Sequence, residues 1–364
     1  MIIGAGAAGL NAAYVLTRAG FSVRIVDPFE PRSTALWASG GMLAAGFEPC
    51  VELDDEALQA FEFARLCESA ALRWPEFARS VEKDSGTALH FDTRGILVPF
   101  GDENSMRHCD QIAARAERLE IPFELLTADQ IEALEPGLAT PERALFFPND
   151  GQVDNRALKA GLEQSLSALG RVSIRGKVSA LSRTAGRVTG VELTDGRTIE
   201  ADIVVLATGA NPIAQQLTGI DITPVKGQML ALDLTGIPVP GRVVRAPSIY
   251  LAPKPDRLVV GATSEPGVDD LSTQEDAMEA MLGRADAVIP GLRNAKRLER
   301  WAGLRPFAPN AMPVIGEAQP GLMVSLGGYR NGVLLAPLMA QTLCQLLDGK
   351  DVDDAVRPFL HSEA

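Results

Sequence analysis

The chain has 364 residues and a formal net charge of −13, with 34 Lys and Arg against 47 Asp and Glu. This length favours two domains, and 46% hydrophobic with 22% charged residues excludes extensive disorder. The acidic balance argues against nucleic acid or an anionic membrane as the main partner, because both bind clustered Lys and Arg.

Cysteine and histidine usage disfavours a metal site, so no metal ligands are predicted. The four cysteines, Cys50, Cys67, Cys109 and Cys344, form no CxxC pair. There are only three histidines, His90, His108 and His361. Free thiols without a secretory segment indicate a reducing, cytoplasmic location. The apolar stretch 333–347 is too short for a membrane span and is interrupted by Gln341 and Gln345.

The N-terminus is typical of a βαβ unit. A short strand over 1–3 leads into a Gly-x-Gly-x-x-Gly motif at Gly4, Gly6 and Gly9, followed by a predicted helix over 10–19 and a strand over 21–27. Three residues before Gly4 are few for this strand, so we expect either a natural start upstream or a shortened chain.

Each glycine of the motif has a mechanical role. Gly4 permits the tight turn, Gly6 lets a pyrophosphate approach the backbone, and Gly9 lets the helix pack close to the sheet. Asp27, 18 residues after Gly9, stands where a carboxylate accepts hydrogen bonds from ribose hydroxyls. Such an acid disfavours a 2′-phosphate, which excludes NADP and leaves FAD and NAD; a glycine turn without a ligand is the alternative.

Further elements follow along the chain. A hairpin is expected around 90–99 in a helix-rich region, and Asp154 is a candidate N-cap for a helix over 156–169. The other predicted strands cover 172–174, 176–184, 187–193, 198–200, 203–207, 229–234, 248–253, 258–263 and 322–326. The remaining predicted helices cover 272–288 and 333–347.

These elements predict an α/β fold in which a discontinuous Rossmann-like dinucleotide-binding domain carries an inserted mixed-sheet α+β substrate domain. The first domain is expected to comprise 1–80, 148–217 and 302–364, and the second 81–147 and 218–301.

Three later segments bear on the choice between FAD and NAD. They are residues 35–44, residues 301–306 with their continuation at 312–316, and residues 327–337. With them the chain resembles the FAD-dependent D-amino-acid oxidase superfamily, and within it the glycine oxidases of thiamine biosynthesis. Residues 225–229, 250–253 and 258–263 are similar to that branch too. The resemblance runs from about 2 to 349 and makes the first domain FAD-binding.

The expected cofactor site has a physical rationale. The turn 328–332, opening the last helix, offers N–H groups and a positive helix end to the flavin N1–C2=O edge. The turn 40–42 lets backbone touch the flat ring. Ordinary turns and strand packing are the alternative. The motif and the resemblance together give these cofactor-binding candidates: Gly4, Gly6, Ala7, Ala8, Gly9, Asp27, Pro28, Ala35, Leu36, Gly40, Gly41, Met42, Val178, Gly209, Gly328, Tyr329, Arg330, Asn331, Gly332, Val333 and Leu334.

The resemblance also implies a substrate site. Arg305 matches the family's carboxylate anchor, Tyr250 its phenolic companion and Arg330 a second arginine; a guanidinium grips a carboxylate with two parallel hydrogen bonds. A surface ion pair is the alternative for each arginine. No catalytic side chain is expected, since the flavin does the redox chemistry, and the three histidines are interpreted as surface or core residues.

Two departures from the family bear on the cofactor. The family often has His where Gly328 stands and Asp where Asn310 stands, and the missing histidine is expected to alter flavin tuning or substrate choice. No Cys lies near 310–313, where relatives with covalent flavin carry one. Non-covalent FAD is therefore expected.

The predicted function is an FAD-dependent oxidase of glycine, small N-alkyl glycines or D-amino acids. It would give an imine, with O2 as acceptor yielding H2O2, and would serve thiamine biosynthesis, with a homo-oligomer implied by relatives. The alternatives are a D-amino-acid dehydrogenase that uses a quinone or carrier, a non-catalytic flavin-binding subunit and, as the weakest, an NAD dehydrogenase.

Overall fold

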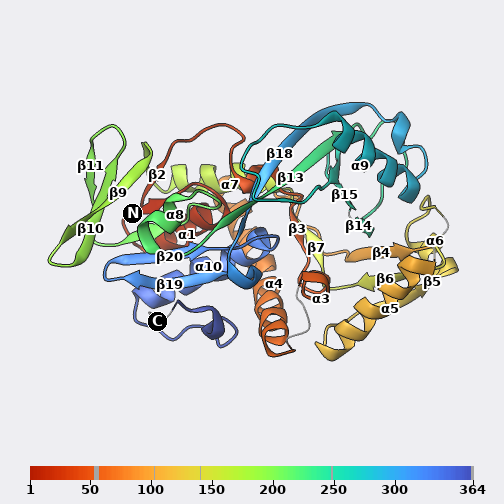
Figure 1. Cartoon of the computed structure of the whole chain (residues 1–364), viewed down its shortest axis with the longest axis horizontal. Helices are drawn as coiled ribbons and strands as arrows, with labels where there is room; N and C mark the ends of the chain where they lie inside the picture. The colour runs from red at the N-terminus through yellow and green to blue at the C-terminus, as the bar shows by residue number, and fades with distance from the viewer. Residues whose placement is uncertain (53–56, 102, 140, 247–248, 362–364) are drawn as a thin grey trace.

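The computed structural model describes residues 1–52, 57–101, 103–139, 141–246 and 249–361. Figure 1 shows two groups of sheets side by side, with the N- and C-termini at the same end. One end holds a six-stranded and a three-stranded sheet, and the other a nine-stranded sheet. The α/β class and the Rossmann-like arrangement expected from the sequence are confirmed.

The six-stranded sheet is the core of the first group. Its order is β19 (Val314–Gln319), β20 (Leu322–Leu326), β12 (Val204–Leu206), β1 (Ile2–Ile3), β2 (Arg24–Asp27) and β8 (Val172–Arg175). All neighbours are parallel except β19, which is antiparallel to β20. Parallel strands bring their carboxyl ends to one edge, where ligands of such sheets bind.

The helices α1 (Ala7–Arg18) and α10 (Gly332–Leu347) pack on this sheet with apolar faces. The helices α4 (Ala57–Ser85) and α7 (Asn155–Ala168) pack against α10 and α1 respectively. The buried side of α1, with Leu10, Ala13 and Leu16, shares one core with that of α10. Asp154 caps α7, as expected: its side chain accepts hydrogen bonds from the N–H groups of Arg156 and Ala157. The smaller helices and strands outside the six-stranded and nine-stranded sheets are α2 (Ala35–Ala38), α3 (Pro49–Glu52), α8 (Ile213–Thr218), β3 (Met42–Leu43), β7 (Gly151–Gln152), β9 (Val178–Thr184), β10 (Arg187–Leu193) and β11 (Thr198–Glu200).

The nine-stranded sheet forms the second group. Its strands are β17 (Glu265–Pro266), β13 (Thr223–Leu232), β16 (Leu258–Gly261), β15 (Ile249–Pro253), β14 (Val243–Ala246), β4 (Ile96–Phe100), β6 (Arg143–Phe147) and β5 (Glu124–Thr127), with β18 (Arg297–Phe307) paired to β13. The helices α5 (Glu103–Arg118), α6 (Ala128–Leu134) and α9 (Glu275–Val288) accompany it. Three 3-10 turns cover Leu292–Asn294, Pro309–Ala311 and Arg357–Phe359.

The structure differs from the sequence predictions in local pairing. The hairpin expected around 90–99 is wrong, because β4 pairs with β6 and β14 instead of folding back on its own neighbours. Of the strand predicted over 248–253, residue 248 lies outside the described residues and the rest forms β15. The domain boundaries stay a prediction; β18 runs across the expected boundary at 301/302, and α4 across that at 80/81. Among the described residues, no helix is both long and apolar enough to cross a membrane.

Candidate active site

A cavity of about 1200 Å³ is lined by residues from both groups of sheets. Of the residues predicted to bind cofactor or substrate, these line it: Gly4, Gly6, Ala7, Ala8, Asp27, Pro28, Ala35, Leu36, Gly40, Gly41, Met42, Val178, Gly209, Tyr250, Arg305, Gly328, Tyr329, Arg330, Gly332 and Val333. Three predicted residues lie behind the lining: Gly9, Asn331 and Leu334. The structure thus brings together segments that are far apart in sequence.

The glycine motif forms one end of the cavity. A Cβ on Gly9 would lie 1.9 Å from the carbonyl oxygen of Gly4, so Gly9 allows α1 to pack against the turn. Gly4 has a φ of +108°, which favours glycine, whereas a Cβ on Gly6 would meet open space. Gly6 is the N-cap of α1, and no side chain among the described residues caps this end. The first-turn N–H groups of α1 can therefore receive an anion.

Asp27 lies beside this helix end. Its Oδ2 accepts a hydrogen bond from the backbone N–H of Ala5 at 2.8 Å, and its Oδ1 accepts one from that of Phe29 at 2.5 Å. The carboxylate therefore fixes both the glycine turn and the loop that follows β2. Each oxygen retains a second lone pair, which leaves acceptor capacity for the ribose hydroxyls expected from the sequence.

A second helix end faces the cavity at the start of α10. Asn331 is its N-cap, is 3% exposed, and does not cap the helix with its side chain. A Cβ on Gly328 would lie 2.7 Å from the Cα of Gly332, so this turn leaves no room for a side chain where the family often has histidine. The backbone N–H of Tyr329 donates to the carbonyl of Pro306 at 3.1 Å, which joins this turn to β18.

Residues behind Leu36–Gly41 hold that segment of the cavity wall in place. The Nδ2 of Asn155 donates to the carbonyls of Leu36 and Trp37 at 2.9 and 2.7 Å. The indole N–H of Trp301 donates to the carbonyl of Ala38 at 2.9 Å. These contacts satisfy carbonyls at the end of α2 and fix the turn that follows it. The sequence prediction did not include the supporting side chains.

Tyr250 is packed between two glycines. A Cβ on Gly40 would come within 2.7 Å of its ring, and one on Gly261 within 2.6 Å of its Cζ. Gly261 is the cross-strand partner of Tyr250 between β15 and β16. Burial raises the pKa of the Tyr250 hydroxyl, so the phenol stays protonated and can donate a hydrogen bond.

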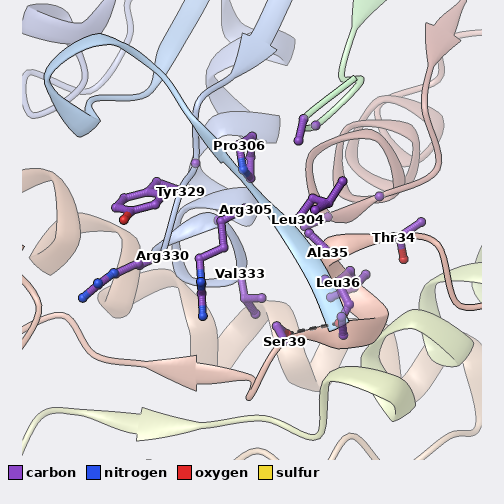
Figure 2. A pocket seen from close by; sticks show the side chains of 18 of the residues that line it. Thr34, Ala35, Leu36, Ser39, Leu304, Arg305, Pro306, Tyr329, Arg330 and Val333 are labelled. Atoms are coloured by element: carbon purple, nitrogen blue, oxygen red, sulfur yellow. Dashed lines mark hydrogen bonds between the residues drawn. The ribbon is translucent and has the colours of Figure 1, made fainter. Parts of the chain in front are cut away.

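Arg305 lies over Gly227 of the neighbouring strand. A Cβ on Gly227 would come within 2.4 to 2.7 Å of the guanidinium atoms, so a side chain at residue 227 would displace the guanidinium from this position. Its Nη1 donates to the carbonyl of Thr263 at 3.2 Å, and no carboxylate of the described residues forms an ion pair with it. Burial lowers the pKa of its guanidinium below the ordinary value. Figure 2 shows the Arg305 side chain extending alongside Val333, and the Arg330 side chain extending away from Val333, to the lower left of the view.

Two charged residues that the sequence analysis missed also line the cavity. Glu48 has a side chain 3% exposed, and its Oε1 lies 3.0 Å from Nη2 of Arg245. Its Oε2 lies 3.8 Å from Nη1 of Arg330. Arg245 is the cross-strand partner of Tyr250, and its guanidinium lies 4.6 Å from the centroid of the Phe47 ring. The sequence signal for this pair was Arg245 itself, a charged residue in the strand that pairs with the strand of Tyr250.

Asp150 fixes the loop that carries Glu48. It is fully buried, and its oxygens accept hydrogen bonds from the N–H groups of Gly46 at 2.6 Å and Phe47 at 3.0 Å. Burial raises the pKa of Asp150 to about 7. His108, interpreted from the sequence as a surface or core residue, is exposed on α5 and borders the same cavity.

The arrangement fits an elongated, anionic dinucleotide with a planar ring. The N-terminus of α1 offers N–H groups to phosphates, and the N-terminus of α10 offers a second positive dipole. The glycine turn 40–41 offers a flat surface. Beyond this surface lie Tyr250 and the arginines, which suit a small carboxylate. The residues present therefore fit FAD with an amino acid beside it.

Comparisons with known proteins agree with this geometry. A family model described as FAD dependent oxidoreductase matches residues 1–346. The chain is 32% identical to the bifunctional protein ThiO/ThiG of Synechocystis sp., covering 100% of this chain and 53% of that protein, so it spans about half of that relative's length. It is 29% identical to the glycine oxidase of Pseudomonas putida, covering 96% and 94%. The crystal structure of glycine oxidase from Geobacillus kaustophilus matches with a TM-score of 0.89 and 26% identity, covering 100% and 98%.

Proposed function

Since the chain belongs to the FAD dependent oxidoreductase family, we propose that it is an amine oxidase of the glycine-oxidase type. Its substrates would be glycine, small N-alkyl glycines or small D-amino acids. The observation that carries this proposal is Arg305, a half-buried cation that lines the cavity and forms no ion pair with a carboxylate of the described residues. Similarity to proteins named glycine oxidase supports the same substrate class.

The cavity residues divide into a cofactor part and a substrate part. FAD would be held by the N-termini of α1 and α10, by Asp27 and by the turn 40–42. We propose that it binds non-covalently, because no cysteine stands within 310–313. When bound, FAD supplies an acceptor for the hydride that leaves the substrate α-carbon. The guanidinium of Arg305 would pair with the substrate carboxylate, and the phenol of Tyr250 would donate to the same group.

Positioning is then the main task of this chain. Holding the carboxylate between Arg305 and Tyr250 fixes the α-carbon in one place, and such orientation can contribute about 7–11 kcal/mol to lowering a barrier. The apolar surroundings of Tyr250, including Met229, Ala252 and Trp301, keep bulk water away from the reacting carbon. Oxidation of glycine in this way yields an imine, which adds water and releases ammonia and glyoxylate. We propose O2 as the electron acceptor, giving H2O2, with a role in thiamine biosynthesis.

Anaerobic spectrophotometry of the FAD-loaded protein tests the proposal. Glycine, sarcosine, D-alanine, D-proline and larger D-amino acids are added in turn, and the flavin absorbance is followed. We expect rapid bleaching by glycine or sarcosine and rapid recovery on admitting O2. Bleaching by D-alanine with slow recovery in O2 would favour a dehydrogenase that uses another acceptor. A protein that holds FAD but is bleached by no amine would contradict the enzyme function.

A further inference from the structure

The carboxylate of Glu48 is buried at the substrate end of the cavity, and only one of its two oxygens is hydrogen-bonded or closely paired. Its side chain is 3% exposed, and Oε1 lies 3.0 Å from Nη2 of Arg245. Oε2 is buried without a hydrogen-bond partner in the described structure, and Nη1 of Arg330 lies 3.8 Å from it. An unsatisfied buried carboxylate oxygen costs free energy, so this atom needs a donor.

Glu48 shares its surroundings with the residues that would bind the substrate carboxylate. Burial lowers the pKa of Arg305, and the negative charge of Glu48 opposes that shift. Burial raises the pKa of Tyr250, and the charge of Glu48 adds to that increase. Glu48 is therefore within electrostatic reach of both groups, and it lines the same cavity.

A small amino acid offers only two polar groups to such a site. Its carboxylate would be repelled by Glu48 and attracted by Arg305, whereas its amine is an N–H donor that a carboxylate accepts with a charge-assisted hydrogen bond. An amine that donates one N–H keeps its lone pair, which must form the C=N bond as the hydride leaves.

On the basis of the proposed function, we propose that Oε2 of Glu48 accepts a hydrogen bond from the substrate amine while Arg305 holds the carboxylate. Glu48 is then a substrate-binding residue that selects amine-bearing acids over acids without an amine. Arg245 balances the charge of Glu48 and holds its other oxygen, so that Oε2 remains directed at the substrate.

The test compares two ligands in the FAD-loaded Glu48→Gln variant. One is glycine, or whichever amine of the panel reduces the wild type most rapidly, and the other is acetate, which lacks the amine. We expect kcat/KM for the amine to fall by about tenfold or more, mainly through KM, because a charged acceptor becomes neutral. Acetate should inhibit equally well or more tightly, because a repelling charge has been removed. These opposite responses identify contact with the amine.

Matched variants separate this role from a structural one. Asp269→Asn removes an exposed charge at the edge of the same cavity. It should change KM for the amine and the inhibition constant of acetate by less than about twofold. If Glu48→Gln fails to retain FAD because Arg245 loses its counter-charge, the double variant with Arg245→Gln restores the balance, and the same opposite responses are expected there. Parallel losses for amine and acetate, or an unchanged amine KM, would overturn the proposal. Failure of every amine to reduce the wild type would instead reject the proposed function.

Discussion

The ring of Tyr250 lies so close to Gly40 that a Cβ on the glycine would come within 2.7 Å of Cε2 and 3.0 Å of the hydroxyl oxygen. Gly40 belongs to the segment that follows α2, whereas Tyr250 belongs to β15, so this contact joins the cofactor part of the cavity to the substrate part. The absence of a side chain at residue 40 therefore decides where the phenol stands.

Gly40→Ala tests this relationship. We expect the added methyl group to displace the Tyr250 ring and to raise KM for the amine substrate by about tenfold, since overpacking typically costs about 1–3 kcal/mol. Steady-state kinetics and FAD titration measure the two effects. Gly101→Ala is the control, because a Cβ there would meet nothing closer than Pro141 Cα at 3.9 Å. An unchanged KM in Gly40→Ala would show that the ring does not position the substrate.

Arg305→Leu should abolish carboxylate binding without loss of cofactor. We expect kcat/KM for glycine to fall, with a loss of about 2–5 kcal/mol in transition-state stabilisation, because the substrate carboxylate is left without its partner. Arg305→Lys should recover only part of this, since an ammonium lacks the two-pronged geometry. The absorbance spectrum reports FAD content in each variant. A Leu variant with wild-type kcat/KM would remove Arg305 from the site.

How far the sequence could predict this site depends on the range of the interactions. The contact of Gly9 with Gly4 is local, so the spacing of the motif encodes it. The helix predicted over 10–19 is present as α1, which begins three residues earlier, at Ala7. The placement of Gly9 behind the cavity agrees with its expected packing role, whereas Leu334 was expected at the cofactor. Leu334 is fully buried, and its carbonyl accepts a hydrogen bond from the indole of Trp74.

Glu48 and Arg245 could not be predicted, because their proximity depends on distant parts of the chain. The loop bearing Glu48 is held by Asp150, about a hundred residues later in the sequence. Arg245 reaches the cavity only because β14 pairs with β15 in a register that places it opposite Tyr250. Neither residue belongs to a motif whose spacing carries information, so only the folded structure brings them together.

Asp27→Ala should weaken FAD binding through the backbone. The variant removes the acceptor for the N–H groups of Ala5 and Phe29. The glycine turn before the N-terminus of α1 then loses its fixed shape. Loss of hydrogen bonds to a charged group costs about 1–3 kcal/mol, so the Kd for FAD should rise by about tenfold or more. Fluorescence titration of the apoprotein measures it. Asp195→Ala, at an exposed turn, should leave the Kd unchanged. Equal affinities in the two variants would contradict this role of Asp27.

Asp150 should make stability depend on pH in an unusual direction. Burial raises the pKa of its carboxyl to about 7 from 3.8, so between these values the folded state binds more protons than the unfolded state. Stability contributed by this group therefore falls as pH rises from about 4 to about 7, the reverse of the behaviour of a carboxylate held in an ion pair. The cause is desolvation, which the N–H groups of Gly46 and Phe47 offset only in part.

Asp150→Asn isolates this effect, because the amide does not titrate. Both proteins are unfolded thermally at several pH values between 4 and 8, and the difference in Tm is plotted against pH. We expect the wild type to be more stable than the variant by the largest margin near pH 4, with the margin shrinking as pH approaches 7, where the buried carboxyl loses its proton. A difference in Tm that is constant over this range, or that grows with pH, would show that Asp150 is already ionised in the folded protein at acidic pH.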